Sequence, residues 1–237
     1  MIAAARRVRQ DIESISFPQA AYRYNPLRYA WEPHQEYLRR YGEGPAGRTL
    51  LVGMNPGPWG MAQTGVPFGD PVMVHDWMGI EGRILPFAGA HPRCPVMGFA
   101  SHRREGSGKR LYGWAQRRYG SAQAFFARNF VLNYFPLLLL DEHGVNLTPA
   151  ILPASERAAV AAVCDPYLRR VVKAIRPSCI AGVGKYATEQ VRRVVGGLGL
   201  EIPTPCLLHP SPANPTANSN WEQLVEGELC SAGVELP

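Results

Sequence analysis

Short apolar runs without polar alternation recur along the chain, and each predicts a strand that is buried on both faces. The runs are Thr49–Gly53, Phe130–Phe135, Cys179–Val183 and Cys206–Leu208. Unbroken runs of this length are typical of parallel strands that helices cover on both sides. The pattern therefore predicts a parallel sheet.

Helical patterns separate these runs. One covers Ser155–Ile175, where Ser155 is suited to cap the start and Pro166 to kink or split the helix. Another covers Lys185–Val195 and ends at a pair of glycines. Strands that alternate with helices favour an α/β fold.

Prolines and glycines gather where the predicted strands end. The segment GMNPGPWG follows the first strand, and HPSPANPTAN follows the fourth. In open α/β sheets, ligands bind beyond the carboxyl ends of the strands. We therefore expect a functional site at this edge of the sheet.

The length of 237 residues favours one domain over residues 1–237 with a sizeable core. The longest apolar stretch, Tyr134–Leu140, is far too short to span a membrane, and no apolar segment of a signal peptide follows the basic start. The five cysteines are scattered and none forms a CxxC pair, which favours reduced thiols. We expect a protein that is not secreted.

The net charge is +6, and only three of the 25 basic residues are lysine. Basic residues are dense between His102 and Arg118, with Tyr112, Trp114 and Tyr119 beside or among them. Such a stretch is typical of a protein surface that binds a nucleic acid. Solvated arginines encoded by a biased genome are the alternative explanation.

Three polar residues at predicted strand ends are candidates for chemistry. Asn55 lies in the first loop, and its amide both donates and accepts hydrogen bonds, although an isolated Asn-Pro-Gly also suits a simple turn. His209 opens the fourth loop, where it fits either acid–base and electrostatic work or a structural role. Asn133 lies near the end of the second predicted strand, where both halves of its amide can bind a ligand edge that carries a hydrogen-bond donor beside an acceptor.

Long motifs resemble those of the single-strand-selective monofunctional uracil-DNA glycosylases, within the uracil-DNA glycosylase superfamily. The likeness is carried by GMNPGPWGMAQTGVPFG at Gly53–Gly69 and HPSPANPTAN at His209–Asn218. It extends to Tyr24–His34, Asn146–Pro149 and Gly182–Gly184.

The resemblance implies a three-layer α/β/α sandwich around a four-stranded parallel sheet. It implies an enzyme of base excision repair that flips uracil, or 5-substituted uracils such as 5-hydroxymethyluracil, out of DNA and hydrolyses the N-glycosidic bond. An abasic site remains. The partner is single- or double-stranded DNA, with no metal, cofactor or membrane, and the enzyme is a monomer of the bacterial cytoplasm and nucleoid or of a eukaryotic nucleus.

The resemblance also implies a role for individual residues. Asn55 positions water, His209 stabilises the departing base, Phe68 stacks on uracil and Asn133 reads its edge. The other implied substrate contacts are Met54, Gly57 and Met61. The implied DNA contacts are Asn146, Thr148, Gly184, Lys185, Ser211, Pro212, Ala213 and Asn214.

Two features of this sequence qualify the resemblance. None of the three lysines lies in the motifs of Asn55, Asn133 or His209, which agrees with a monofunctional enzyme because a lyase needs an amine nucleophile. Position 213 is alanine where the family commonly has arginine, so single-stranded substrates become more important.

Two other classes of protein share some of these sequence features. A zinc-dependent nucleobase deaminase needs the motifs H-x-E and P-C-x-x-C. The chain has the first motif as His34-Gln35-Glu36. In the second, which begins at Pro205-Cys206, His209 replaces the second cysteine. A lesion-binding module without catalysis is the other alternative, and the intact Asn55 argues against it.

Overall fold

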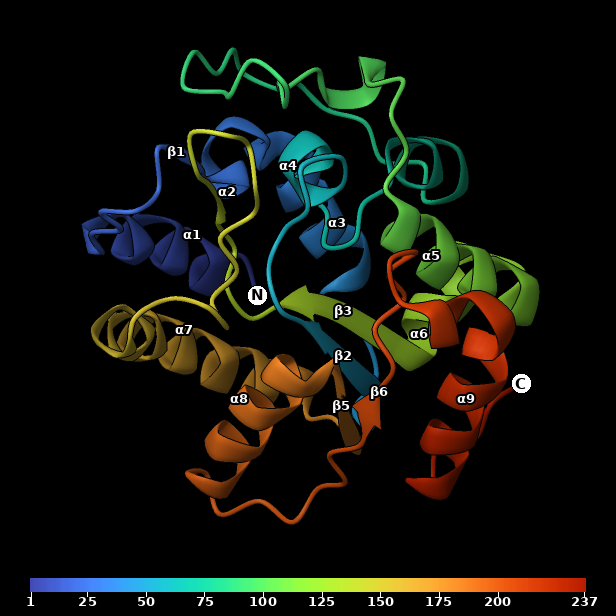
Figure 1. Ribbon diagram of the computed structural model, residues 1–237. Coiled ribbons are helices and arrows are strands. Elements are labelled where there is room, and N and C mark those ends of the chain that lie inside the picture. The colour runs from blue at the N-terminus through green and yellow to red at the C-terminus, as the bar shows by residue number, and fades with distance from the viewer.

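The computed structural model describes all residues, 1–237, and its centre is a four-stranded parallel sheet with the strand order β3-β2-β5-β6. The strands are β2 (Thr49–Gly53), β3 (Asn129–Asn133), β5 (Cys179–Val183) and β6 (Cys206–Leu207). Every residue of β2, β3 and β5 is buried, as the unbroken apolar runs predict. The predicted parallel sheet is confirmed (Figure 1).

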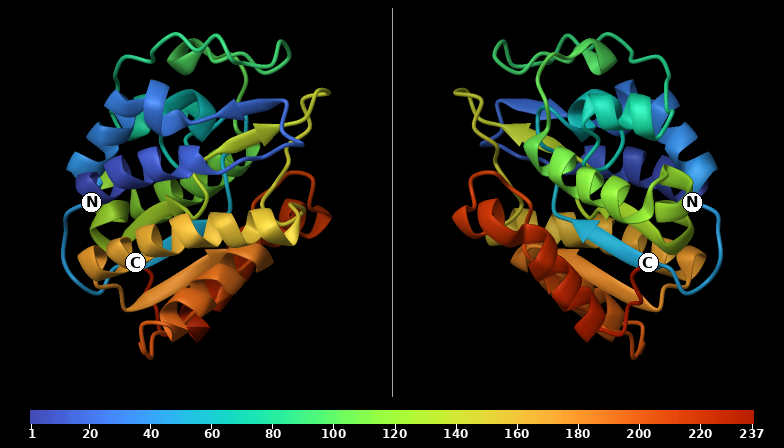
Figure 2. Two further views of the ribbon diagram at one scale, coloured as in Figure 1. Left: turned by 90° about the vertical axis from the view of Figure 1, so that its left-hand side faces the viewer. Right: turned by 90° about the vertical axis from the view of Figure 1, so that its right-hand side faces the viewer.

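Helices cover both faces of this sheet. Figures 1 and 2 show α7 (Ala154–Ile175) and α8 (Lys185–Gly196) on one side. The other side carries α5 (Gly106–Tyr119), α6 (Ala122–Arg128) and α9 (Pro215–Ser231). The three-layer α/β/α sandwich is therefore confirmed.

Three predicted strand boundaries differ from the structure, and the first is the start of the second strand, which lies at Asn129 instead of Phe130. The second strand ends at Asn133, because the next two backbone N–H groups, of Tyr134 and Phe135, bind the carbonyl oxygens of Gly53, the last residue of β2, and of Met54, which lies beyond its end. The fourth strand ends one residue early, at Leu207.

Helix α7 differs in its details from the sequence pattern. Pro153 is its N-cap residue, and Ser155 lies inside the first turn without capping it, so the predicted Ser155 cap is wrong. Pro166 does not split the helix, which remains continuous over 22 residues. Burial of a long apolar face, including Val160 and Leu168, stabilises the helix despite the missing N–H.

A small antiparallel sheet was not predicted. It pairs β1 (Tyr22–Tyr24) with β4 (Leu138–Leu140) and adjoins a second, smaller apolar cluster. The remaining elements are α1 (Ile2–Asp11), η1 (Ile12–Ser14), α2 (Pro26–Tyr29), α3 (Trp31–Tyr41), α4 (Met61–Thr64), η2 (Met73–Trp77) and η3 (Gly98–Ala100).

The basic and aromatic stretch becomes part of the fold. Tyr112 and Trp114 are fully buried in α5, so neither ring can stack on a nucleic acid. Most of the arginines bind groups of the protein: Arg104 binds Asp70, Arg110 binds Pro210, Ser211 and Asn218, Arg117 binds Glu222, and Arg118 binds Glu226. The stretch as a whole is therefore not an open nucleic-acid surface.

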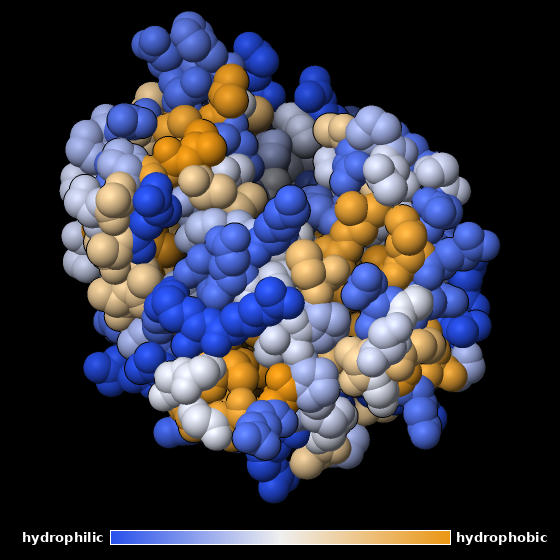
Figure 3. Space-filling view, turned by 60° about the horizontal axis from the view of Figure 1, so that its bottom comes forward, coloured by the Kyte–Doolittle hydropathy of each residue, from blue (hydrophilic) through white to orange (hydrophobic).

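No helix of the structure combines the length and the apolar character needed to cross a bilayer. On the face shown in Figure 3, apolar residues form separate patches divided by hydrophilic ones. Scattered patches of this kind are ordinary for a folded surface.

Candidate active site

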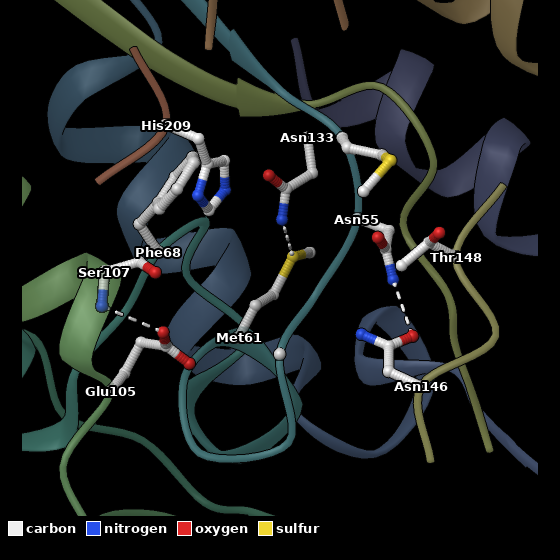
Figure 4. Close-up of a pocket in the computed structure, with 11 residues that line it drawn as sticks. Asn55, Met61, Phe68, Glu105, Ser107, Asn133, Asn146, Thr148 and His209 are labelled. Carbon is white, nitrogen blue, oxygen red and sulfur yellow. Dashed lines mark hydrogen bonds between the residues drawn. The ribbon is translucent and has the colours of Figure 1, made fainter. Parts of the chain in front are cut away.

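A cavity of about 230 Å³ lies at the carboxyl ends of β2 and β3, where the sequence predicts a site (Figure 4). All seven residues predicted as catalytic or substrate-binding line it, although they come from three separate segments of the chain. The complete lining is Met54, Asn55, Gly57, Met61, Phe68, Glu105, Ser107, Asn133, Asn146, Thr148 and His209.

Asn133, the last residue of β3, points its amide into the cavity. The residue is 3% exposed, and its Nδ2 donates to the sulfur of Met61 at 3.3 Å. Its Oδ1 atom is buried and accepts no hydrogen bond. Because an unpaired buried acceptor costs about 1–3 kcal/mol, this oxygen is a strong site for an N–H donor from a ligand.

Phe68 forms an apolar wall beside Asn133. Its φ of +54° lies in the left-handed region, which is uncommon for a bulky residue. The neighbouring fold holds this strained backbone, since the Tyr112 hydroxyl donates to the carbonyl of Pro67 at 2.6 Å. Gly53 makes room for both side chains, because a Cβ atom there would lie 2.5 Å from the Phe68 ring and 2.6 Å from Asn133 Oδ1.

Asn55 lies beyond the end of β2, where a second asparagine fixes its orientation. Its Nδ2 donates to Asn146 Oδ1 at 3.2 Å and to the carbonyl of Pro56 at 3.2 Å. Because these bonds use both hydrogens of Nδ2, the Oδ1 atom of Asn55 is the part of the amide that is available to accept a hydrogen bond from water. The structure thus places Asn146, predicted as a DNA contact, against Asn55 in the cavity wall (Figure 4).

His209, just beyond β6, has a tautomer set by the protein backbone. The backbone N–H of Ser211 donates to His209 Nδ1 at 3.2 Å, so the hydrogen of the neutral ring lies on Nε2. Burial lowers the pKa of His209, which keeps the ring neutral at pH 7. The ring lies beside Phe68, with their centroids 6.2 Å apart. A neutral imidazole can therefore donate from Nε2 to a ligand.

Glu105 was missed by the sequence analysis, although it forms one wall of the cavity. Its carboxylate accepts from the backbone N–H of Ser107 at 3.1 Å, and burial raises its pKa. A Cβ atom at Gly57 would lie 2.6 Å from Glu105 Oε2, so Glu105 occupies the space that a side chain at position 57 would need. Glu105 is about fifty residues from Asn55 in the sequence and carries no local motif.

The segment after His209, Pro210–Asn214, forms a loop docked on the start of α5. Arg110 Nη1 donates to the carbonyl of Pro210 at 3.1 Å, and its Nη2 donates to Asn218 Oδ1 at 2.7 Å. Asn214 caps α9 by accepting from the N–H of Thr216, and Ala213 is exposed. Four of the predicted DNA contacts thus lie in one loop beside the cavity: Ser211, Pro212, Ala213 and Asn214.

The other predicted DNA contacts lie in two places. Thr148 lines the cavity, and Gly184, with φ at +88°, approaches His209, since a Cβ atom there would lie 3.6 Å from His209 Cβ. Lys185 is exposed at the start of α8 and lines a different hollow, together with Arg157 and Arg193.

The residues of a zinc deaminase do not assemble. No group of three or more His, Cys, Asp or Glu side chains is placed to hold a metal ion. His34 is fully buried in α3, where its Nδ1 lies 2.7 Å from the carbonyl oxygen of Gly65. Burial lowers the pKa of His34 to about 4. The deaminase interpretation is therefore wrong for this chain.

Comparisons with known proteins identify the family to which this chain belongs. A model of the uracil DNA glycosylase superfamily matches residues 41–226. The single-strand selective monofunctional uracil-DNA glycosylase of Rattus norvegicus is 43% identical over 96% of this chain and 82% of its own length. That of Bos taurus is 42% identical over 96% of this chain and 84% of its own.

A solved structure supports the fold independently. The crystal structure of wild-type Pedobacter heparinus SMUG2 superimposes with a TM-score of 0.68, at 17% identity, over 96% of each chain.

Proposed function

Because this chain belongs to the single-strand-selective monofunctional uracil-DNA glycosylases of the uracil-DNA glycosylase superfamily, we propose that the cavity at the ends of β2 and β3 binds a flipped uracil and holds the groups that release it. The enzyme hydrolyses the N-glycosidic bond of uracil in DNA. The bond breaks toward an oxocarbenium-like sugar and a uracil anion.

The observation that carries the assignment of the cavity is the unpaired Oδ1 of Asn133. Uracil presents an N–H donor at N3 beside a carbonyl acceptor at C4. The amide of Asn133 matches this pattern, with Oδ1 toward N3–H and Nδ2 toward the carbonyl, once Nδ2 leaves its weak sulfur acceptor on Met61. Cytosine presents the opposite pattern, so its binding leaves buried groups unpaired.

Asn55 and His209 supply the chemistry on this proposal. Asn55 Oδ1 orients a water molecule, because Asn146 holds the other half of its amide. A strong base is not needed, since the oxocarbenium-like sugar is itself highly electrophilic. His209 Nε2–H donates to the uracil carbonyl oxygen on which charge develops, and a preorganised donor of this kind is worth roughly 3–4 kcal/mol.

The proposal also covers the remaining base and DNA contacts, the range of substrates and the place where the enzyme works. Phe68 stacks on the base, and the backbones of Met54 and Gly57 face it, with Met61 in the wall. The loop from Ser211 to Asn214, together with Thr148, Gly184 and Lys185, approaches the DNA. We propose that 5-substituted uracils such as 5-hydroxymethyluracil are also excised, from single- and double-stranded DNA, by a monomer that works in the nucleoid or the nucleus.

Incubation with a single-stranded oligonucleotide that carries one uracil tests the proposal. Free uracil should be released, and the strand should break only after alkaline treatment, because no lysine of the site can form a Schiff base. The same oligonucleotide with cytosine is the control. Binding without release of uracil would instead favour a lesion-binding module.

A further inference from the structure

Two arginines near the cavity remain free while their neighbours are paired. Arg104 binds the buried carboxylate of Asp70 at 2.7 Å, whereas the adjacent Arg103 makes no ion pair. Its guanidinium group lies over the ring of Trp59, 4.5 Å from the centroid. Arg93 is likewise exposed and without an acidic partner.

Arg93 and Arg103 share one hollow, to which Trp59 contributes an aromatic wall and Gly144 an edge. Its lining contains no aspartate or glutamate. Both guanidinium groups lie near the Cys94 thiol and lower its pKa, although burial raises that pKa by more. The lining of the hollow therefore contributes two positive charges and no compensating acid.

The hollow is continuous in sequence with the candidate active site. Trp59 belongs to the same loop as Asn55 and Gly57, and Gly144 lies two residues before Asn146. Two of the segments that bound the cavity therefore also bound the hollow. A DNA strand whose target base enters the cavity must pass its adjoining nucleotides over the neighbouring surface.

We propose that Arg93 and Arg103 bind backbone phosphates of the DNA strand next to the flipped nucleotide. The inference rests on the proposed function, because it places the hollow relative to the base in the cavity. A guanidinium group can bind a phosphate through two parallel N–H donors. Stacking on Trp59 holds Arg103 in place, so less side-chain entropy is lost when the phosphate binds.

The salt dependence of DNA binding tests the proposal. The probe is a single-stranded oligonucleotide with one tetrahydrofuran residue, which has no base to excise. Each phosphate contact contributes about 0.7 to the slope of log K against log salt for single strands. Arg93→Gln and Arg103→Gln should each lower the slope by about 0.7, and the double variant by about 1.4. Between about 50 and 200 mM salt, each single variant should lose two- to threefold less affinity than the wild type.

Arg128→Gln is the matched control. It removes the same charge from an exposed position at the end of α6, beside the first residue of β3 and hence at the opposite end of the sheet. Its slope should equal that of the wild type. Arg103→Lys should restore the slope of Arg103→Gln, because a lysine keeps the charge near the phosphate.

The outcomes separate this inference from the proposed function. Uracil release at saturating DNA should be unchanged in both variants, since neither arginine lines the cavity. Wild-type slopes in Arg93→Gln and Arg103→Gln, with uracil release intact in the wild type, would overturn the phosphate site alone. Equal slope changes in Arg128→Gln would also overturn it, because the effect would then report net charge only.

Discussion

The substitution Asn133→Asp tests how the base is read, because it changes one donor into an acceptor at nearly constant volume. An ionised aspartate can still accept from N3–H of uracil, but its second oxygen faces the C4 carbonyl, which also only accepts. Two buried acceptors are then unpaired, at a cost of about 1–3 kcal/mol each. The sum of about 2–6 kcal/mol predicts a loss of about 30- to 3 × 10⁴-fold in kcat/KM for uracil.

The same substitution should respond to pH in a particular direction. Position 133 is buried at the end of β3 beside Met61, so burial raises the pKa of the introduced carboxyl group. Once protonated, that group donates through O–H to the C4 carbonyl and accepts from N3–H, as the amide does. Uracil excision by the variant should therefore recover as the pH falls.

Single-turnover excision from a uracil oligonucleotide over a range of pH measures this effect. Asn133→Leu is the control, because leucine has a similar size but can neither donate nor accept. It should lose activity without recovery at low pH. Wild-type activity of Asn133→Asp at neutral pH, or equal pH profiles for the two variants, would show that Asn133 does not read uracil.

Three further predictions concern the chemistry and the DNA loop. Asn55→Ala and His209→Ala should each lower kcat by about 10²–10³ while DNA affinity changes little, as single-turnover rates and binding titrations would show. Burial lowers the pKa of His209, and its neutral Nδ1 accepts from the Ser211 backbone. Activity should therefore hold through neutral pH and fall only at a pH below about 6.5. An inflection of the pH profile at or above about 6.5 would contradict this. Ala213→Arg should raise excision from duplex DNA by about ten- to a hundredfold more than from single strands, since a charge-assisted bond worth about 1.5–3 kcal/mol would offset the cost of flipping the base. Equal gains on both substrates would show that position 213 does not limit flipping.

The central sheet could be predicted from the sequence because its strands are buried on both faces. For β2 and β5 the apolar runs end where burial ends, so even the bounds agree. The pairing of β1 with β4 could not be predicted, because it joins Tyr22 to Leu140 and each strand has only three residues. No period-two pattern can develop over so short a length.

The candidate site could be predicted where its side chains follow the ends of strands. It could not be predicted where a residue reaches the site through contacts with residues that are distant in the sequence. Asn55, Asn133 and His209 each stand just beyond or at the end of a predicted strand. Glu105 reaches the cavity only because α5 begins beside the first loop. Arg104 is paired and Arg103 is not, because Asp70, more than thirty residues earlier in the sequence, lies beside Arg104.

The polar groups of the cavity are organised by neutral partners, and this bears on how the bond is broken. An amide holds Asn55, a sulfur atom faces Asn133, and a backbone N–H holds His209. A carboxylate on Nδ1 would stabilise the imidazolium and raise the pKa of His209, whereas the Ser211 N–H favours the neutral ring. On the proposed mechanism, a neutral donor would stabilise the departing uracil anion without a charge that must be desolvated before the base arrives. On the proposed mechanism the site therefore acts through dipoles, and those of Asn55 and His209 are already oriented before the substrate binds.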